Sequence, residues 1–262
     1  MPPAQMDFKN KTVVLTGASS GIGYSLAKLL PKENCSIALL SRRENKLNDL
    51  LNDLKTSGVQ VRAYKCDVGT SDEVRNIFSQ VLNDFGKIDI AILNAGASSR
   101  ADVSKYSSST AKEIFEANTF GIINCVEQLL PDFMKRKEGV IIGVSSLAES
   151  RGFPKSGFYN ASKAAATLLL ESLRIELKPY NIKVMIVKPG FVKTPMTDKN
   201  EFHMPFLMDA DKAAKIILNG IKKEKKIIQF PFTTVIGSKI VKFMPDWMFD
   251  FFMSKQLPAR RN

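Results

Sequence analysis

The feature that most constrains this chain is the alternation, over its first 190 residues, of short apolar runs with longer stretches of helical spacing. The apolar runs lie at 11–16, 35–40, 59–65, 88–93, 139–144 and 182–187, and the helical stretches at 21–30, 44–56, 71–84, 110–137 and 158–178. Strands alternating with helices predict a doubly wound α/β fold around a parallel sheet. The runs are continuously apolar, which is typical of strands covered by helices on both faces. We therefore predict a single domain, residues 1–262, with a parallel sheet of about seven strands.

Composition narrows the class of protein further. The chain has 262 residues, 44% hydrophobic and 24% charged, which is typical of a globular protein. It has no run of 18 apolar residues and no apolar leader at its start, so we expect neither a spanning helix nor a secretory signal. Cys35, Cys66 and Cys125 are far apart, and His203 is the single histidine. We therefore predict a cytoplasmic protein with no metal site.

A glycine-rich turn, TGASSGIG at 16–23, directly follows the first apolar run. Glycines at such a place permit a tight turn and a close approach of the backbone to a pyrophosphate, and the helix that follows offers free N–H groups to the phosphates. The alternative is a strand-to-helix turn that needs glycine only for its shape. The position of the turn in the first strand–helix unit favours a Rossmann-type dinucleotide site. The residues that we predict to bind there are Gly17, Ser19, Ser20, Gly21, Ile22 and Gly23.

The charge of the side chains at the end of the second predicted strand distinguishes a site for NAD from a site for NADP. A carboxylate about 20 residues beyond the glycines would bind the ribose of NAD. This chain instead has Ser41 and Arg42 there, and no Asp or Glu lies between Asn34 and Arg43. A guanidinium can bind a 2′-phosphate through paired hydrogen bonds. We therefore predict that Ser41 and Arg42 favour NADP(H) over NAD(H); the alternative is that the arginines simply begin a solvated helix.

Tyr159 and Lys163 are four residues apart in a predicted helix and so share one face. An ammonium near a phenol lowers its pKa from about 10, so that Tyr159 could give a proton to a carbonyl oxygen or take one from an alcohol. Ser146, at the end of the fifth apolar run, is placed to hold the substrate oxygen. Asn118 puts a polar amide into a helical run, for which the alternative role is an ordinary core amide.

From about Asn10 to Thr194 these motifs resemble, in order and spacing, those of the short-chain dehydrogenase/reductase family. The resemblance implies that Asn118, Ser146, Tyr159 and Lys163 form a catalytic tetrad, in which the lysine also binds the nicotinamide ribose and the asparagine holds a water of a proton relay. It also implies cofactor contacts on three further segments. These are Asp67 and Val68 near the adenine, Asn94, Ala95 and Gly96 along the cofactor, and Pro189, Gly190, Val192 and Thr194 at the nicotinamide carboxamide.

We predict that residues 191–233 form a substrate lid and the last helix–strand unit. Several apolar side chains between 195 and 208 make the lid oily and deformable: Phe202, Met204, Phe206, Leu207 and Met208. This favours a lipophilic carbonyl or alcohol over a charged sugar, with mere sealing of the domain edge as the alternative. His203 is interpreted as a lid residue without a catalytic role.

Residues 234–262 form an apolar and basic tail. The net charge of the chain is +12, and from Lys222 onward nine Lys or Arg stand against three acids. No recognition motif accompanies this charge, so we predict no nucleic-acid partner. Pro245, Asp246 and Asp250 exclude a membrane span. We expect one or two short helices packed on the substrate side of the same domain or of a second subunit, in a homodimer or homotetramer, with peripheral membrane contact as an alternative.

Together these features predict an NADP-dependent oxidoreductase that transfers a hydride between nicotinamide and a small carbonyl or alcohol, with Tyr159 as general acid and base. A non-catalytic NADP(H) sensor is one alternative, which the intact Tyr159–Lys163 pair argues against. A membrane-surface interaction protein is another, and the intact glycines argue against it.

Overall fold

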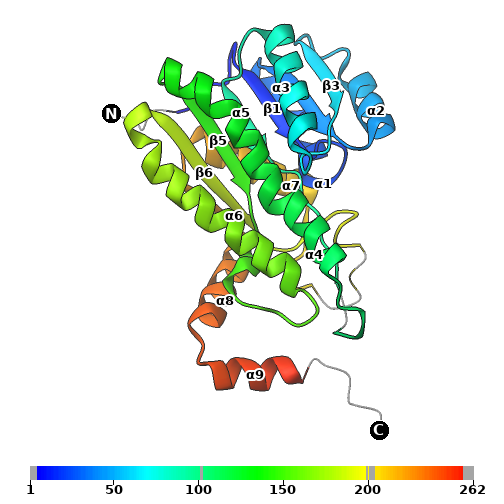
Figure 1. Ribbon diagram of the computed structural model, residues 1–262, viewed down its shortest axis with the longest axis vertical. Coiled ribbons are helices and arrows are strands. Elements are labelled where there is room, and N and C mark those ends of the chain that lie inside the picture. Colours follow the sequence, from blue (N-terminus) through cyan, green and yellow to red (C-terminus); the bar gives the residue numbers. More distant parts are fainter. Residues whose placement is uncertain (1–4, 101–102, 199, 201–203, 256–262) are drawn as a thin grey trace.

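The computed structural model describes residues 5–100, 103–198, 200 and 204–255, which form one α/β domain (Figure 1). The strands of its main sheet are β1 (Thr12–Thr16), β2 (Ser36–Ser41), β3 (Val61–Lys65), β4 (Ile90–Leu93), β5 (Gly139–Val144), β6 (Ile182–Pro189) and β9 (Ile227–Phe230). They pair in the order β3-β2-β1-β4-β5-β6-β9, and every pairing is parallel. A second, two-stranded sheet joins β7 (Val192–Lys193) to β8 (Met208–Asp209). The predicted doubly wound parallel sheet of about seven strands is confirmed.

Helices connect the strands. The α-helices are α1 (Gly21–Leu29), α2 (Glu44–Leu54), α3 (Ser71–Phe85), α4 (Ser108–Phe115), α5 (Gly121–Arg136), α6 (Gly157–Glu176), α7 (Ala210–Lys222), α8 (Phe232–Phe243) and α9 (Asp246–Ser254). Short 3₁₀ turns are η1 (Leu30–Glu33), η2 (Val103–Lys105), η4 (Leu147–Ser150) and η5 (Lys178–Tyr180), and η3 (Glu116–Phe120) is a π-helical turn.

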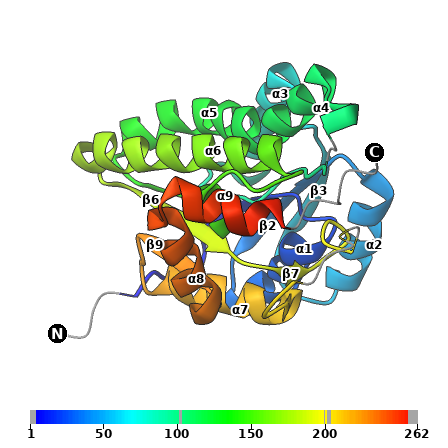
Figure 2. The same cartoon turned by 90° about the horizontal axis from the view of Figure 1, so that it is seen from below.

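The two faces of the sheet are covered by different helices, as the view from below shows (Figure 2). On one face α3, α5 and α6 pack on the strands, with Phe78, Phe133 and Leu170 fully buried. On the other face α1, α2 and α7 do so, with Leu26 and Ile217 fully buried. Since both faces are covered, most residues of the central strands are buried and apolar, although β1 begins and ends with Thr and β6 contains Lys183 and Lys188. The two edge strands, β3 and β9, each have a neighbour on one side only and contain exposed residues. In β9 exposed and buried residues alternate, and in β3 Arg62 and Lys65 are exposed.

The winding direction fixes where a ligand can bind. The chain runs from β1 outward to β2 and β3, and then returns to add β4, β5 and β6 on the other side of β1. In such sheets ligands bind outside the carboxyl ends of the strands, at the point where the strand order reverses. Here that point lies between β1 and β4.

The helix predicted at 110–137 is divided in the structure. A π-helical turn, η3, separates α4 from α5 and contains Asn118 and Thr119, both buried. A π turn adds one residue to a helical turn, and such turns are frequent at functional sites. The polar residue Asn118, which interrupts the helical run in the sequence, therefore lies in this π-helical turn.

The C-terminal segment forms α8 and α9 at one end of the molecule (Figure 1). Helix α8 packs beside η4 and β9. Helix α9 is held by Arg151, whose Nη1 donates to the carbonyl oxygen of Met244 (2.8 Å) and whose Nη2 donates to Oδ1 of Asp246 (2.7 Å). The same guanidinium lies 4.4 Å from the ring centroid of Phe249. None of the helices in the described part of the chain is both long and apolar enough to cross a bilayer.

Candidate active site

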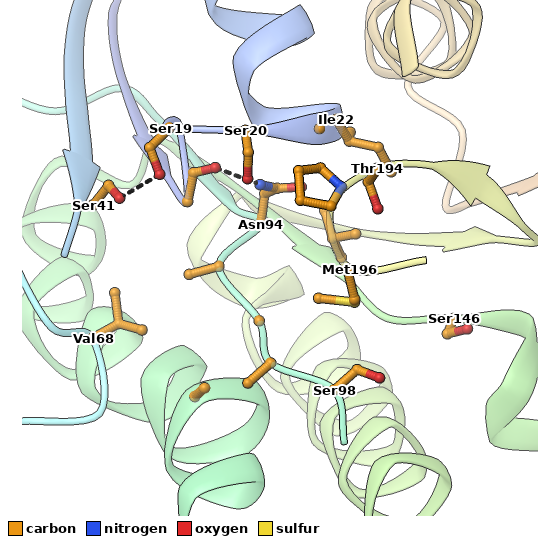
Figure 3. Close-up of a pocket in the computed structure, with 18 of the residues that line it drawn as sticks. Ser19, Ser20, Ile22, Ser41, Val68, Asn94, Ser98, Ser146, Thr194 and Met196 are labelled. Atoms are coloured by element: carbon orange, nitrogen blue, oxygen red, sulfur yellow. Dashed lines mark hydrogen bonds between the residues drawn. The ribbon is translucent and has the colours of Figure 1, made fainter. Parts of the chain in front are cut away.

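A cavity of about 610 Å³ opens at the carboxyl ends of the strands (Figure 3). This volume is ordinary for a small-molecule site. The cavity is lined by all of the predicted site residues except Gly23 and Asn118. Residues spread from position 17 to position 194 are therefore brought together around one space.

The glycine-rich turn is packed so closely that side chains would not fit. A Cβ on Gly17 would lie 2.8 Å from Cα of Ala95, and one on Gly23 would lie 2.2 Å from the carbonyl oxygen of Gly17. Gly21 has a φ of +55°, and its Cβ would meet Thr194 at 2.7 Å. The first turn of α1 contains no acidic residue and has no side-chain cap. Its N–H groups and positive dipole end therefore remain available to an anion in the cavity.

The segment after β4 is tied to the first strand. The side-chain oxygen of Thr16 accepts the backbone N–H groups of Asn94 and Ala95, each at 3.0 Å. The amide of Asn94 donates back to the carbonyl oxygen of Thr16 (3.1 Å). These bonds fix Asn94, Ala95 and Gly96 along one side of the cavity.

Asn118 lies behind this segment and not on the cavity wall. Its Nδ2 donates to the carbonyl oxygen of Ala97 and to Oγ of Ser162, both at 2.9 Å, and its Oδ1 accepts the N–H of Ala97 (2.8 Å). A Cβ on Gly96 would lie 2.8 Å from that Oδ1. The chain itself thus satisfies the amide, which links the segment after β4 to α6.

Tyr159 and Lys163 lie on α6, and Ser146 lies at the start of η4. The Nζ atom of Lys163 lies 6.0 Å from the ring centroid of Tyr159 and donates to the carbonyl oxygen of Val144 (2.9 Å). Oγ of Ser146 accepts the N–H of Ala148 (3.1 Å). A phenol, a hydroxyl and an ammonium therefore meet on one side of the cavity, an arrangement that can hold an oxygen atom and exchange a proton with it.

Burial shifts the pKa values of both titratable groups. It raises the pKa of Tyr159, and a hydrogen bond with the Ser146 hydroxyl partly offsets this rise. It lowers the pKa of Lys163 to about 8, against the opposing effect of the Glu149 carboxylate. The pKa of Tyr159 was expected to fall through the charge of the ammonium; in the structure the loss of phenolate hydration has the larger effect and raises it.

A second arginine, Arg43, which was not among the predicted site residues, reaches the glycine-rich turn. Nη2 of Arg43 donates to Oγ of Ser19 (2.8 Å) and to Oγ of Ser20 (2.5 Å), and the Ser19 hydroxyl is hydrogen-bonded to that of Ser41 (2.6 Å; Figure 3). The predicted residue, Arg42, also lines the cavity, but its Nη1 lies 3.5 Å from Oδ2 of Asp67. The only sequence signal for Arg43 was its position beside Arg42.

The segment predicted to form a lid is described in part. Pro195, Met196 and Thr197 line the cavity. Phe206 and Leu207 are exposed, Met204 is half-buried, and Met208 is buried in β8. Phe202 and His203 lie outside the described residues.

The cysteines do not form a reactive centre in this structure. Cys35, Cys66 and Cys125 are buried with free thiols, and burial raises the pKa of each. Within the described ranges, no group of three or more His, Cys, Asp or Glu side chains is placed to hold a metal ion.

A glycine-rich turn at the reversal point of a parallel sheet defines a dinucleotide-binding class of protein. Comparison with known proteins narrows this class. A family model described as short chain dehydrogenase matches residues 11–204. The chain belongs to the short-chain dehydrogenase family.

Relatives agree with this placement. An uncharacterized oxidoreductase of Myxococcus xanthus (strain DK1622) is 31% identical over 247 residues, which are 94% of this chain and 97% of that protein. The 3-oxoacyl-(acyl-carrier-protein) reductase FabG of Staphylococcus epidermidis (strain ATCC 35984) is 30% identical over 190 residues, 72% of this chain and 78% of that protein.

Solved structures share the fold. A short chain dehydrogenase/reductase from Burkholderia phymatum in complex with NAD has a TM-score of 0.84 at 21% identity, covering 98% of this chain and 99% of its own. A short-chain dehydrogenase from Sphingobium yanoikuyae in complex with NADPH has a TM-score of 0.79 at 23% identity, covering 96% of this chain and 98% of its own.

Proposed function

We propose that this protein is an NADP(H)-dependent oxidoreductase that interconverts a carbonyl compound and an alcohol, with Tyr159 as the general acid and base. The observation that carries the proposal is the meeting of Tyr159, Ser146 and Lys163 in the cavity that the glycine-rich turn also lines. The name of the relative FabG, a 3-oxoacyl reductase, supports chemistry at a carbonyl group.

The cavity fits a nicotinamide dinucleotide. Gly21, with its positive φ, leaves the start of α1 without a side chain, and the lining continues from there to Ser146 and Lys163. Residues 17–23 would hold the phosphates, Asp67 and Val68 the adenine side, and the segment from Pro189 to Thr194 the nicotinamide. When bound, the cofactor supplies or accepts the hydride.

The protein's own side chains move the proton. The Tyr159 hydroxyl gives its proton to the carbonyl oxygen during reduction and takes one from the alcohol during oxidation. Oγ of Ser146 accepts the N–H of Ala148, so its own proton can be donated to the substrate oxygen. At pH 7 the ammonium is the main form of Lys163, because its pKa of about 8 is higher. Its positive charge favours the phenolate form that follows proton transfer.

The preference for NADP(H) rests on basic side chains beside the turn. Arg43 contacts Ser19 and Ser20, Arg42 lines the same part of the cavity, and no carboxylate occupies the end of β2. Of the two similar structures described above, one is in complex with NAD and the other with NADPH, so the shared fold accommodates either cofactor. In this chain a guanidinium that can pair with a 2′-phosphate favours NADP(H).

The substrate that we propose is lipophilic. Met196 lines the cavity, and the exposed Phe206 and Leu207 belong to the same loop. Apolar, deformable side chains at the mouth of a site favour an apolar ligand.

The test is a panel of carbonyl compounds and alcohols followed at 340 nm with NADPH or NADH. Turnover of apolar carbonyls with NADPH is expected. A protein that binds NADPH but turns over no member of the panel would instead be a sensor, the alternative function.

We further propose a cytoplasmic homodimer or homotetramer whose tail packs on its own domain or on a second subunit. The outer faces of α8 and α9 support an interaction of this segment, because Phe232, Ile240, Phe243, Trp247 and Phe251 are exposed. Contact with acidic lipid would be peripheral and sensitive to salt, since the exposed charge is screened. Gel filtration of the full chain and of a chain ending before Phe232 tests whether the tail holds subunits together. Sedimentation with vesicles at low and high salt tests for contact with lipid.

A further inference from the structure

A buried ion pair lies behind the proposed active site. Nζ of Lys188, the residue before Pro189 in β6, lies 2.5 Å from Oε1 of Glu149 in η4 and 3.8 Å from Oε1 of Glu171 in α6. The side chains of Lys188 and Glu149 are only 9% and 15% exposed. Removing two charges from water is costly, and such pairs seldom stabilise a fold more than apolar residues would. This pair therefore calls for an explanation other than stability.

The second carboxylate oxygen of Glu149 joins the pair to the site. The Ser145 hydroxyl lies 2.9 Å from this oxygen and 3.0 Å from the carbonyl oxygen of Lys163, so it can donate to either. The Thr167 hydroxyl can donate to Ser145 (2.7 Å) or to Glu149. One carboxylate thus contacts groups on three segments, namely the end of β5, α6 and β6.

Each of these segments carries a proposed active-site residue next to the contact. Ser145 precedes Ser146, Lys188 precedes Pro189, and the carbonyl that faces Ser145 belongs to Lys163 itself. Glu149 therefore links the three segments through side chains, in addition to the backbone pairing of β5 with β6.

We propose that Glu149 and Lys188 are positioning residues of the active site: the carboxylate, held by Lys188, fixes Ser146 and Lys163 relative to each other and to the start of the nicotinamide-binding segment. The proposal rests on the proposed function. Neither residue contacts the reacting atoms.

The carboxylate also acts on Lys163 through its charge. Glu149 on η4 raises the pKa of Lys163, which burial lowers to about 8. Of the other charged or titratable groups near this network, Tyr159 and Glu171 lie on the same helix as Lys163, and Lys188 faces both Glu149 and Glu171. Without Glu149 the ammonium would lose its proton at lower pH.

The test compares Glu149→Gln with Glu171→Gln. Glu171 is a matched control because it also faces Lys188 but has no contact with Ser145 among those that the structure shows. Two readouts are needed, the pH dependence of NADPH affinity measured by fluorescence titration, and kcat and KM for a carbonyl that the wild type reduces.

For Glu149→Gln we expect kcat to fall about 10- to 100-fold, as small displacements of catalytic groups do, with KM changed less than about two-fold. The loss of NADPH affinity and of kcat with rising pH should begin at lower pH than in the wild type. Glu171→Gln should match the wild type in both readouts. Wild-type kcat and pH profiles in Glu149→Gln, or equal effects of both variants, would overturn the proposal.

A double variant, Glu149→Gln with Lys188→Met, separates positioning from folding. It leaves no unpaired buried charge, so its thermal unfolding should return towards that of the wild type, while kcat stays low. Recovery of kcat together with stability would show that the pair has only a structural role. A wild type that fails to bind NADPH would contradict the proposed function instead, so the two failures can be distinguished.

Discussion

Replacing Arg43 by alanine should weaken NADPH binding and leave NADH binding nearly unchanged. In the structure the Arg43 guanidinium is fixed beside the glycine-rich turn by bonds to Ser19 and Ser20. The Arg42 guanidinium instead lies 3.5 Å from the carboxylate of Asp67 and its side chain is 56% exposed. A 2′-phosphate would therefore meet Arg43 as the better-placed donor.

The magnitude follows from the chemistry of the contact. A hydrogen bond to a charged group contributes about 1.5–3 kcal/mol, and about 1.4 kcal/mol corresponds to ten-fold in affinity. Arg43 is exposed, so solvent and salt screen its charge and the lower end of the range applies. We expect the Kd for NADPH to rise about ten-fold and the Kd for NADH to change less than about two-fold.

Fluorescence titration of both cofactors with wild type, Arg43→Ala and Arg42→Ala measures this directly. The Arg42→Ala variant should show the smaller loss, since the negative charge of Asp67, 3.5 Å from that guanidinium, opposes a phosphate there. Equal affinity of the wild type for NADPH and NADH would refute the cofactor preference. A larger loss in Arg42→Ala would refute the role given to Arg43.

Two further predictions concern packing. Gly23→Ala should destabilise the domain by about 1–3 kcal/mol, seen as a lower Tm, because its Cβ would lie 2.2 Å from a backbone oxygen. As a control, Gly237→Ala in α8 adds a Cβ that meets nothing within 4 Å, and should leave Tm unchanged or slightly higher. Equal Tm values for the two variants would contradict the packing described. Arg151→Met should speed amide hydrogen exchange in α9 by about ten-fold, because the hydrogen bonds to Met244 and Asp246 are lost. Helix α5 serves as the internal reference. Unchanged exchange in α9 would show that another contact holds this helix.

Much of the fold could be predicted because local pattern and tertiary position agree. Strands that are buried on both faces need apolar residues at nearly every position, so the apolar runs of the sequence predict the sheet directly. The starts of strands were harder to predict: β3 begins at Val61 instead of residue 59, and β4 begins at Ile90 instead of residue 88. An apolar run can begin before the residues that pair with the neighbouring strand, so it does not mark the first paired residue. Helical spacing did not distinguish a continuous helix at 110–137 from two helices joined by a π turn. The inserted residue shifts the apolar pattern by only one position, which a short amphipathic pattern does not resolve.

The residues of the candidate site, too, were predictable only in part. Glycines and neighbouring motif residues could be assigned from the sequence because each motif is local. Two contacts could not be predicted: the hydrogen bonds of Arg43 to the glycine-rich turn, and the pairing of Glu149 with Lys188, 39 residues apart. Both depend on how separate segments pack, which one sequence does not reveal. The pKa of Tyr159 was misjudged for a related reason, because its burial follows from the packing of the whole domain.

The measurement that tests the central claim most directly is kcat for Tyr159→Phe on a carbonyl that the wild type reduces, together with its NADPH affinity. Phenylalanine keeps the ring and removes only the hydroxyl that transfers the proton. We expect kcat to fall at least about 10²-fold, as loss of a general acid does, with NADPH affinity unchanged within about two-fold. Wild-type turnover in Tyr159→Phe would contradict the proposed mechanism.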